Sequence, residues 1–487
     1  MNQLAKKFFG LGEYEHANGS YHFLPFNFIR IGPKVLLTNL TGEYTLLSEQ
    51  QFSQFTTKTL ETYSAIYNDL KSRHFLFDAD SSAAIDLLSL KYRTKQARLA
   101  NFTSLHMFVV TLRCDYSCPY CQVSRQSEDK SRYDMSFETA NKSLDLVFQS
   151  PSENIKIEFQ GGEPLLNFSL IQHIVIEAIE RNKVFGKNLQ FVIATNLSFI
   201  SDEVLDFVEQ FGIYISTSLD GPEKLHNKNR PRPGKNGYQL TVDNINLVRD
   251  RIGPERISAL MTTTELSLDR YKEIIDEYIK QGFRSIFLRP LSPYGFAVKT
   301  KQVEKYNVST WLEFYKKALG YILEINKNGY FFREGYTAII LEKMLTPFNP
   351  GYVDLQSPSG LAISAVVYNY DGYVYASDEA RMLAEMGNKD LQIGNIHRDN
   401  YEDIFANEYL LDILESTITN SVPMCTDCVY QNYCGSDPVY HIATQKDPVG
   451  HKGLSSFCKK NMRIFEHLID ILEHNNEDSK ILRSWVH

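Results

Sequence analysis

Short apolar runs alternate with amphipathic segments through the middle of the chain. Six runs rich in β-branched residues have the length of buried strands: Leu105–Thr111, Ile155–Gln160, Leu189–Thr195, Ile213–Leu219, Ile257–Thr263 and Ser285–Arg289. Between them, stretches with apolar residues at three-to-four spacing predict helices, such as Phe137–Phe148, Leu170–Arg181 and Leu240–Arg251. Strands that alternate with helices predict an α/β fold with a parallel sheet, curled or closed as a partial (β/α)6 barrel.

The first hundred residues have a different pattern. Phe23–Ile31 and Lys34–Asn39 predict two strands around Gly32-Pro33, and Ser48–Lys58 and Ile66–Phe77 predict two helices. This order is compatible with a winged-helix domain whose sheet edge accepts a peptide, and equally with a cap over the barrel. We therefore expect an α+β N-terminal domain (1–100), the barrel (101–300), a helical bridge (301–357) and a C-terminal domain (358–487).

The composition is that of an ordinary globular protein, with 43% hydrophobic and 23% charged residues. The 51 basic and 59 acidic residues give a net charge of −8, so nucleic acid is not an expected partner. No apolar run approaches the ~18 residues of a membrane span, and Met1–Gly10 lacks the apolar segment of a secretory signal. We expect a cytoplasmic protein without a membrane partner, whose cysteines serve as ligands or catalysts rather than as disulfides.

The seven cysteines fall into two groups. Three follow the first predicted strand within eight residues, as Cys114-x3-Cys118-x2-Cys121. Four lie near the C-terminus, as Cys425-x2-Cys428-x5-Cys434 and the more distant Cys458. This partition predicts two separate metal sites, one with three thiolates and one with four.

The number of thiolates separates the candidate metals. Three cysteines fit structural zinc poorly, whereas a cubane iron–sulfur cluster takes three thiolates and leaves its fourth iron open for a ligand that is not protein. His106 lies close in sequence, but on a strand we expect it to be packed or solvated rather than a ligand. The four C-terminal cysteines fit either a closed zinc site or a closed iron–sulfur cluster.

Polar motifs also follow the next three predicted strands. They are Gly161-Gly162-Glu163-Pro164, Thr195-Asn196 and Ser218-Leu219-Asp220-Gly221. In barrels of parallel strands, the loops at the C-terminal ends of the strands form the active site. We therefore expect these motifs to meet the three-cysteine loop at one mouth of the barrel.

The three-cysteine motif with Tyr120 before its last cysteine, followed one strand later by Gly-Gly-Glu-Pro, resembles the radical S-adenosylmethionine (radical SAM) superfamily. The resemblance implies that Cys114, Cys118 and Cys121 hold a [4Fe-4S] cluster whose open iron binds the methionyl amine and carboxylate of SAM. It also implies a SAM site built from Tyr120, Gly161, Gly162, Glu163, Pro164, Asn196, Ser218 and Arg230. Taken singly, Asn196, Ser218 and Arg230 fit a helix cap, a turn residue and a solvated loop charge equally well.

The C-terminal cysteines resemble the SPASM extension of peptide- and protein-modifying radical SAM enzymes, which uses seven cysteines for two auxiliary clusters. This chain has Ser377 and Pro438 at positions where that extension has cysteines. The missing cysteines serve one cluster together. The resemblance therefore implies that this cluster is lost and that Cys425, Cys428, Cys434 and Cys458 retain the other, which makes two [4Fe-4S] clusters in total. Zinc at the C-terminal set stays the alternative.

Asp378 directly follows Ser377. Some maturases with this extension have an aspartate there as a proton acceptor, and a carboxylate near a radical would ease its oxidation by taking a proton. Asp378 is the candidate catalytic residue, favoured over Glu379. The alternative is a surface ion-pair cluster of Asp378, Glu379 and Arg381.

More narrowly, the chain resembles the radical SAM maturase of His-Xaa-Ser repeat peptide systems, in segments such as Asp69–Phe75, Lys91–Lys95, Cys121–Arg125 and Ser377–Arg381. This implies an enzyme that cleaves SAM reductively and modifies a ribosomally synthesised precursor peptide by hydrogen abstraction, giving a cross-link, an oxidation or an epimerisation. Expected partners are the precursor peptide, a low-potential electron donor (flavodoxin or ferredoxin) and a second radical SAM maturase. Two alternatives stay open: a maturase of a folded protein, as in sulfatase activation, and a non-catalytic iron–sulfur or zinc scaffold for a partner maturase.

Overall fold

The computed structural model describes residues 21–78, 83–123, 125–474 and 476–486; Met1–Gly10, where the sequence predicts no secretory signal, lies outside them. The chain divides into two compact units. The first contains the chain up to Gln96 together with the short segment Asp427–Asn432, and the second contains Ala97–Thr426 and Tyr433–His487.

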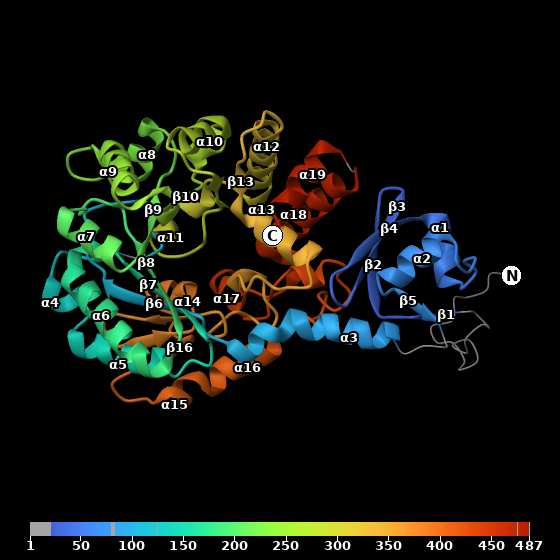
Figure 1. Cartoon of the computed structure of the whole chain (residues 1–487), viewed down its shortest axis with the longest axis horizontal. Coiled ribbons are helices and arrows are strands. Elements are labelled where there is room, and N and C mark those ends of the chain that lie inside the picture. The colour runs from blue at the N-terminus through green and yellow to red at the C-terminus, as the bar shows by residue number, and fades with distance from the viewer. Residues whose placement is uncertain (1–20, 79–82, 124, 475, 487) are drawn as a thin grey trace. The chain divides into compact units, whose positions relative to one another are not determined.

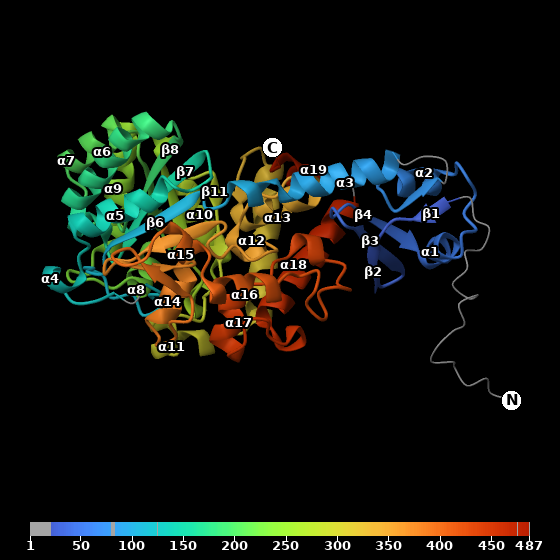
Figure 2. The ribbon, with the colours of Figure 1, turned by 90° about the horizontal axis from the view of Figure 1, so that it is seen from below.

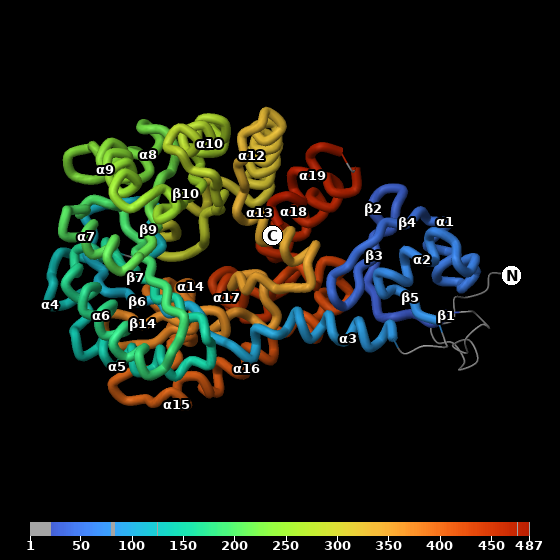
Figure 3. Tube along the Cα trace, viewed as in Figure 1, coloured from blue at the N-terminus to red at the C-terminus, as the bar shows by residue number. Residues whose placement is uncertain are grey.

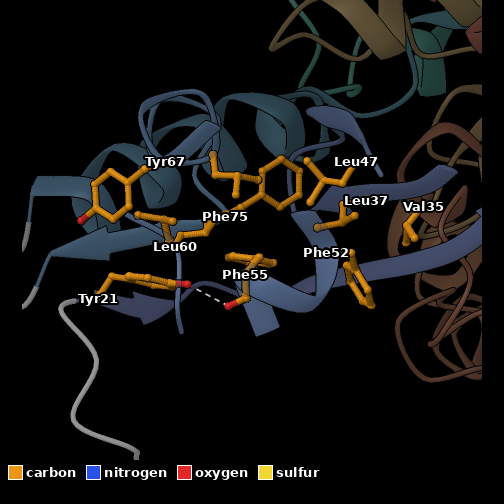
Figure 4. Packing of buried hydrophobic residues seen from close by; sticks show 11 residues of the cluster. Tyr21, Val35, Leu37, Leu47, Phe52, Phe55, Leu60, Tyr67 and Phe75 are labelled. Atoms are coloured by element: carbon orange, nitrogen blue, oxygen red, sulfur yellow. Dashed lines mark hydrogen bonds between the residues drawn. The ribbon is translucent and has the colours of Figure 1, made fainter. Parts of the chain in front are cut away.

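The first unit combines small antiparallel sheets with helices. Its strands are β1 (Tyr21–Phe23), β2 (Phe26–Ile31), β3 (Lys34–Asn39), β4 (Tyr44–Ser48) and β5 (Leu76–Asp78), paired in the orders β1-β5 and β2-β3-β4. Its helices are α1 (Glu49–Thr56), α2 (Ala65–Ser72) and α3 (Ala83–Gln96). Aromatic and aliphatic side chains from these elements form one core, which includes Tyr21, Leu37, Leu47, Phe52, Phe55, Tyr67 and Phe75 (Figure 4).

One strand and one helix predicted for this unit have the wrong boundaries. The predicted strand Phe23–Ile31 is broken between β1 and β2, where Pro25 has no N–H to donate to a ladder. The predicted helix Ile66–Phe77 stops at Ser72, because His74 adopts a φ of 55° and the residues after it pair with β1 as strand β5. The predicted strand Lys34–Asn39 is confirmed as β3.

The second unit is built on a sheet that has, in the described residues, the order β12-β10-β9-β8-β7-β6-β14-β15-β16. Its parallel strands are β6 (Leu105–Thr111), β7 (Asn154–Gly161), β8 (Asn188–Ala194), β9 (Tyr214–Ser218), β10 (Ile257–Thr262) and β12 (Leu288–Arg289). The predicted parallel α/β sheet is therefore confirmed. The predicted strand Ser285–Arg289 divides into β11 (Ser285–Ile286), which pairs with β13 (Arg333–Glu334), and β12, which pairs with β10.

Three further strands extend the sheet beyond β6. Strand β14 (Ala365–Tyr368) runs parallel to β6, and β15 (Tyr373–Tyr375) and β16 (Gln392–Asn395) continue antiparallel. Strands β14 and β15 form a hairpin, and Gly372 has a φ of 84° at its turn.

Helices connect the parallel strands (Figure 1). They are α4 (Lys130–Tyr133), α5 (Phe137–Val147), α6 (Phe168–Phe185), α7 (Asp202–Gln210), α8 (Glu223–Asn229), α9 (Gly237–Ile252), α10 (Tyr271–Lys280) and α11 (Phe296–Lys299). Helix α5 packs against α6, and α7 against α9. Along β7, Ile155, Ile157 and Phe159 are buried on one face.

The rest of the second unit is mostly helical (Figures 2 and 3). It contains α12 (Val308–Lys327), α13 (Gly335–Leu345), α14 (Asp378–Ala384), α15 (Tyr401–Phe405), α16 (Glu408–Ser416), α17 (Pro438–Gln445), α18 (Ser456–Glu473) and α19 (Glu477–Ser484). Helices α12, α18 and α19 pack against one another, and α14 packs against α17 and β14. Among the described residues, no helix combines the length and the apolarity that crossing a bilayer requires.

Candidate functional site

The three N-terminal cysteines lie on the loop that follows β6. The backbone N–H of Tyr116 donates to Cys114 Sγ at 3.4 Å, and the N–H of Cys121 donates to the carbonyl of Cys118 at 3.1 Å. Burial raises the pKa of the Cys118 thiol to about 12; Cys121 adds to this shift, and the Arg230 guanidinium opposes it. Cys118 and Cys121 are thus close enough to influence one another electrostatically.

A segment after the last barrel strand holds this loop in place. The N–H of Phe296 donates to the carbonyl of Cys121 at 2.8 Å. At Gly295, a Cβ would lie 2.4 Å from the carbonyl oxygen of Gln122, and the residue has a φ of 59°. Glycine is required here for both reasons.

Gly161-Gly162-Glu163-Pro164 lies directly against the cysteine loop. A Cβ on Gly161 would lie 2.0 Å from the carbonyl oxygen of Thr111, and one on Gly162 would lie 2.1 Å from that of Arg113. The N–H groups of Gly162 and Glu163 donate to these same two carbonyls at 2.8 and 2.7 Å. The two glycines therefore allow the end of β7 to contact the start of the cysteine loop through backbone alone.

Glu163 is fully buried and connects this loop to the next one. Its carboxylate accepts hydrogen bonds from the Leu165 N–H (3.1 Å), the Thr195 hydroxyl (2.6 Å) and the Asn196 N–H (2.8 Å). Burial raises the pKa of Glu163 to about 7, although these donors oppose the shift. Both carboxylate oxygens are used to hold the loops after β7 and β8 together.

Asn196 reaches back to the cysteine loop. Its Nδ2 donates to Asp115 Oδ1 at 2.9 Å and lies 4.0 Å from Cys114 Sγ, while its Oδ1 accepts from the Ser198 N–H at 2.8 Å. The alternative of a helix cap is wrong, because the N-cap of α7 is Ser201.

A buried carboxylate connects Tyr120 with Arg230. The Tyr120 hydroxyl donates to one oxygen of Asp220, and Arg230 Nε donates to the other at 3.2 Å. Burial by itself lowers the pKa of Arg230, but Asp220, Tyr120 and Cys118 together hold it above the usual value. Arg230 is therefore not a solvated loop charge. Sequence reasoning did not propose Asp220 as a site residue. The one signal for it was its place in the motif Ser218-Leu219-Asp220-Gly221, two residues after the half-buried Ser218.

Three of the four C-terminal cysteines come together in the second unit. Lys452 is only 6% exposed, and its ammonium group interacts electrostatically with three of these thiols, those of Cys425, Cys434 and Cys458. Burial raises the pKa of Cys458 to about 11, and Cys434 and Cys425 add to that shift. Asn461 Nδ2 donates a hydrogen bond to Cys434 Sγ at 3.7 Å.

Cys428 lies in the segment Asp427–Asn432, which belongs to the first unit. There its carbonyl accepts from Asn27 Nδ2 at 3.2 Å, and the carbonyl of Val429 accepts from the Thr38 hydroxyl at 2.6 Å. That Cys428 completes the set of Cys425, Cys434 and Cys458 stays a prediction.

Helices begin at Ser377 and Pro438, the two positions at which the SPASM extension has cysteines and this chain does not. Ser377 is the N-cap of α14 and accepts from the Ala380 N–H at 3.1 Å. Pro438 is the first residue of α17, whose N-cap is Asp437. At these places the chain uses helix-starting residues.

Asp378 and Glu379 at the start of α14 have different surroundings. Asp378 Oδ1 lies 3.5 Å from Arg381 Nε, and Arg381 is 1% exposed, so the alternative of a surface ion-pair cluster is wrong. Asp378 also adds to the raised pKa of Glu158 on β7, a shift caused mainly by burial. Glu379 lines a cavity of about 780 Å³.

This cavity lies where β10 and β12 end. Glu265, Leu268 and Asp269 line it after β10, and the run from Arg289 to Tyr294 lines it after β12. Tyr294 directly precedes Gly295, which contacts the cysteine loop. None of the lining residues belongs to the cysteine loop itself; the connection between cavity and loop runs through Tyr294 and Gly295.

The chemistry of the donors fits iron–sulfur clusters. All seven cysteines are free thiols. In the described part of the chain, no three His, Cys, Asp or Glu side chains converge closely enough to hold a single metal ion. A cubane does not need such convergence, because each thiolate binds a different iron. His106 is no ligand: it is fully buried, with its ring nitrogens 3.1 Å from the Tyr368 hydroxyl and 3.0 Å from the Thr103 carbonyl, as expected of a packed residue.

Residues 108–288 match the family model of the radical SAM superfamily. The chain contains a radical SAM domain. Such a domain implies a [4Fe-4S] cluster and SAM, and the three-cysteine loop lies inside the matched region. The resemblance of the three-cysteine motif to the radical SAM superfamily is thereby confirmed, whereas those to the SPASM extension and to the His-Xaa-Ser maturases stay predictions.

Relatives of known sequence extend the match beyond the barrel. The chain is 32% identical over 187 residues to an uncharacterised protein of Methanocaldococcus jannaschii, a match that covers 38% of this chain and only 61% of that relative. It is 23% identical over 360 residues to the cysteine-type anaerobic sulfatase-maturating enzyme of Clostridium novyi, which covers 72% of this chain and 92% of that enzyme.

Two solved structures share the fold. The structure of anSMEcpe with bound AdoMet has a TM-score of 0.62 and 17% identity, covering 76% of this chain and 98% of that one. Streptococcus suis SuiB bound to the precursor peptide SuiA has a TM-score of 0.54 and 15% identity, covering 89% and 98%. At these identities, the likeness shows the fold alone.

Proposed function

We propose that this protein is a radical SAM enzyme that modifies a ribosomally synthesised precursor peptide by hydrogen abstraction. One observation carries the proposal: the segment after β12 lines a cavity of about 780 Å³ with Tyr294 and contacts the three-cysteine loop with the next residue, Gly295. The volume lies in the range of sites that enclose small ligands or a few side chains. The precursor-bound SuiB structure shares this fold.

In this proposal, Cys114, Cys118 and Cys121 hold the [4Fe-4S] cluster. SAM is bound by Tyr120, Gly161, Gly162, Glu163, Pro164, Asn196, Ser218 and Arg230. Cluster and SAM, when bound, supply the electron and the hydrogen-abstracting radical, with a flavodoxin or ferredoxin as the external donor. The chain positions these groups: Glu163 holds two loops together, and the Asp220–Arg230 pair fixes the guanidinium beside Tyr120.

A second [4Fe-4S] cluster is held by Cys425, Cys428, Cys434 and Cys458. The proximity of three of these thiols to the buried ammonium of Lys452 supports this set, because four thiolates on a cluster carry a net negative charge. A closed cluster has no iron free for substrate, so its role is structural or in electron relay. In the variant Cys114→Ala/Cys118→Ala/Cys121→Ala, iron and sulfide analysis should find one cubane; loss of all iron would contradict this partition.

The proposal also assigns roles to Asp378, to the first unit and to a partner enzyme. Asp378 acts as a proton acceptor for the substrate radical, which its position near Glu158 on the sheet supports. The first unit binds the leader of the precursor, for which β2 is suited: among the described residues, it has a strand partner on one side only. A second radical SAM maturase acts on the same precursor.

The enzymatic part is tested by anaerobic incubation of the reconstituted protein with SAM and dithionite. 5′-Deoxyadenosine should form, and it should be absent with the three-cysteine variant. A wild-type protein with full iron content that forms none would rule out the enzyme and favour the scaffold alternative. Mass spectrometry of the candidate precursor after co-expression then tests the substrate.

The similarity to the Clostridium novyi sulfatase-maturating enzyme supports a second candidate, maturation of a folded protein. A peptide that contains the modified cysteine of a sulfatase separates the two. Modification of that cysteine by this enzyme would favour the second candidate over the first.

A further inference from the structure

The cavity at the ends of β10 and β12 carries charged groups that the proposed function leaves unassigned. Its wall includes the carboxyl groups of Asp354, Glu379 and Asp437 and the cations of Arg289 and Lys460. They come from separate elements: the end of β12, a short turn before β14, the start of α14, the N-cap of α17, and α18. The fold thus collects them around one space.

The three carboxyl groups lie close to one another. Burial, together with Asp354 and Asp378, raises the pKa of Glu379 to about 7, and Arg289 opposes the shift with its Nη2 3.7 Å from Glu379 Oε1. Burial, Asp354 and Glu379 raise the pKa of Asp437, which Lys460 opposes. Burial is the main cause of both raised pKa values, and the neighbouring carboxyl groups add to it. Around the whole cavity, acidic residues outnumber basic ones: Glu265, Asp269, Glu304, Asp354, Glu379 and Asp437 line it together with Arg289, Lys305 and Lys460.

Eight aromatic residues also line the cavity: Phe287, Tyr294, Tyr306, Trp311, Tyr336, Tyr352, Tyr440 and Phe457. Aromatic faces attract cations and tolerate alkyl chains, but they bind carboxylates poorly. The lining therefore favours a ligand that is both cationic and partly apolar.

We propose that this cavity binds a basic side chain of the substrate peptide, with its cation among Asp354, Glu379 and Asp437. This inference rests on the proposed function and names the chemistry of the substrate segment. An added cation reduces the excess of acidic over basic side chains in the cavity wall, and the aromatic rings cover the alkyl part of a lysine or arginine side chain.

The test compares two synthetic peptides on the reconstituted holoprotein: acetyl-Gly-Gly-Lys-Gly-Gly-amide and the same peptide with norleucine in place of lysine. Isothermal titration calorimetry at pH 8, where Glu379 is ionised, should give a Kd about tenfold lower for the lysine peptide. Glu379→Gln and Asp437→Asn should each reduce this preference at least threefold.

Glu473→Gln, the same change at an exposed position on α18, is the matched control and should keep the full preference. Equal affinity for the two peptides, an unchanged preference in both carboxyl variants, or no binding of either peptide at millimolar concentration would each overturn the inference. 5′-Deoxyadenosine formation by the same preparations reports separately on the proposed function: if it persists while the preference is absent, only the inference fails.

Discussion

Replacing Gly162 by alanine is the sharpest test of how the loops after β6 and β7 are joined. The added Cβ would lie 2.1 Å from the carbonyl oxygen of Arg113 and 2.6 Å from that of Leu112. Both obstacles are backbone atoms, so no side-chain rotation relieves the overlap. The Arg113 carbonyl must move, and with it the next residue, Cys114.

The cost follows from two contributions. Overpacking in a close-packed interior costs about 1–3 kcal/mol. Displacing the Arg113 carbonyl also weakens the hydrogen bond that it accepts from the Glu163 N–H at 2.7 Å, worth about 1 kcal/mol. We expect Gly162→Ala to lower the free energy of unfolding by about 2–4 kcal/mol and to reduce the iron content of the three-cysteine site.

Gly320→Ala is the matched control. Gly320 lies exposed inside α12, and a Cβ there would meet nothing within 4 Å. Alanine is favoured over glycine in a helix by about 1 kcal/mol, so this variant should be as stable as the wild type or more so. The assays are urea unfolding, iron and sulfide content, and equilibrium dialysis of SAM. A Gly162→Ala protein that matches the wild type in all three would refute the reasoning.

Three further variants test other parts of the site. Arg113→Met should lower the unfolding free energy by about 3–5 kcal/mol in urea, because it removes both bonds (2.7 and 2.8 Å) to the nearly buried Asp134; equal stability would speak against that role. Glu379 has its pKa raised from 4.5 to about 7, so protonation favours the folded state: the wild type should lose stability as pH rises from about 4.5 to 7, and Glu379→Gln should show a flatter profile in pH-dependent unfolding. If Asp378 accepts the proton, Asp378→Asn should still form 5′-deoxyadenosine while modified peptide, measured by mass spectrometry, falls about 10²–10⁴-fold; unchanged product would exclude the role.

The barrel strands could be predicted because they are buried and therefore apolar along their length. Leu105–Thr111 has the same bounds in the sequence prediction and in the structure, since all but its first residue are buried. The loop motifs could be placed at one mouth for a related reason: parallel strands direct all their C-terminal ends the same way. The errors near Pro25 and His74 lie in short elements, where one turn residue outweighs a few apolar neighbours.

The long-range pairs could not be predicted. Asp220 joins Tyr120 and Arg230 across a hundred residues of sequence, and only the order of the strands brings them together. The fold likewise brings Lys452 close to the thiols of Cys425 and Cys434, which precede it in the sequence. Sequence reasoning favoured Asp378 from a resemblance, while the cavity is lined by the adjacent Glu379; which of two neighbours faces a cavity depends on the helix phase, set here by the cap at Ser377.

Deuterium transfer tests the central proposal most directly. The reconstituted protein is incubated with SAM, dithionite and a perdeuterated precursor peptide, and the 5′-deoxyadenosine is analysed by mass spectrometry together with the peptide. If the protein abstracts hydrogen from the peptide, 5′-deoxyadenosine gains one deuterium in the same reactions that yield modified peptide. 5′-Deoxyadenosine that forms without deuterium, beside an unchanged peptide, would contradict the proposal.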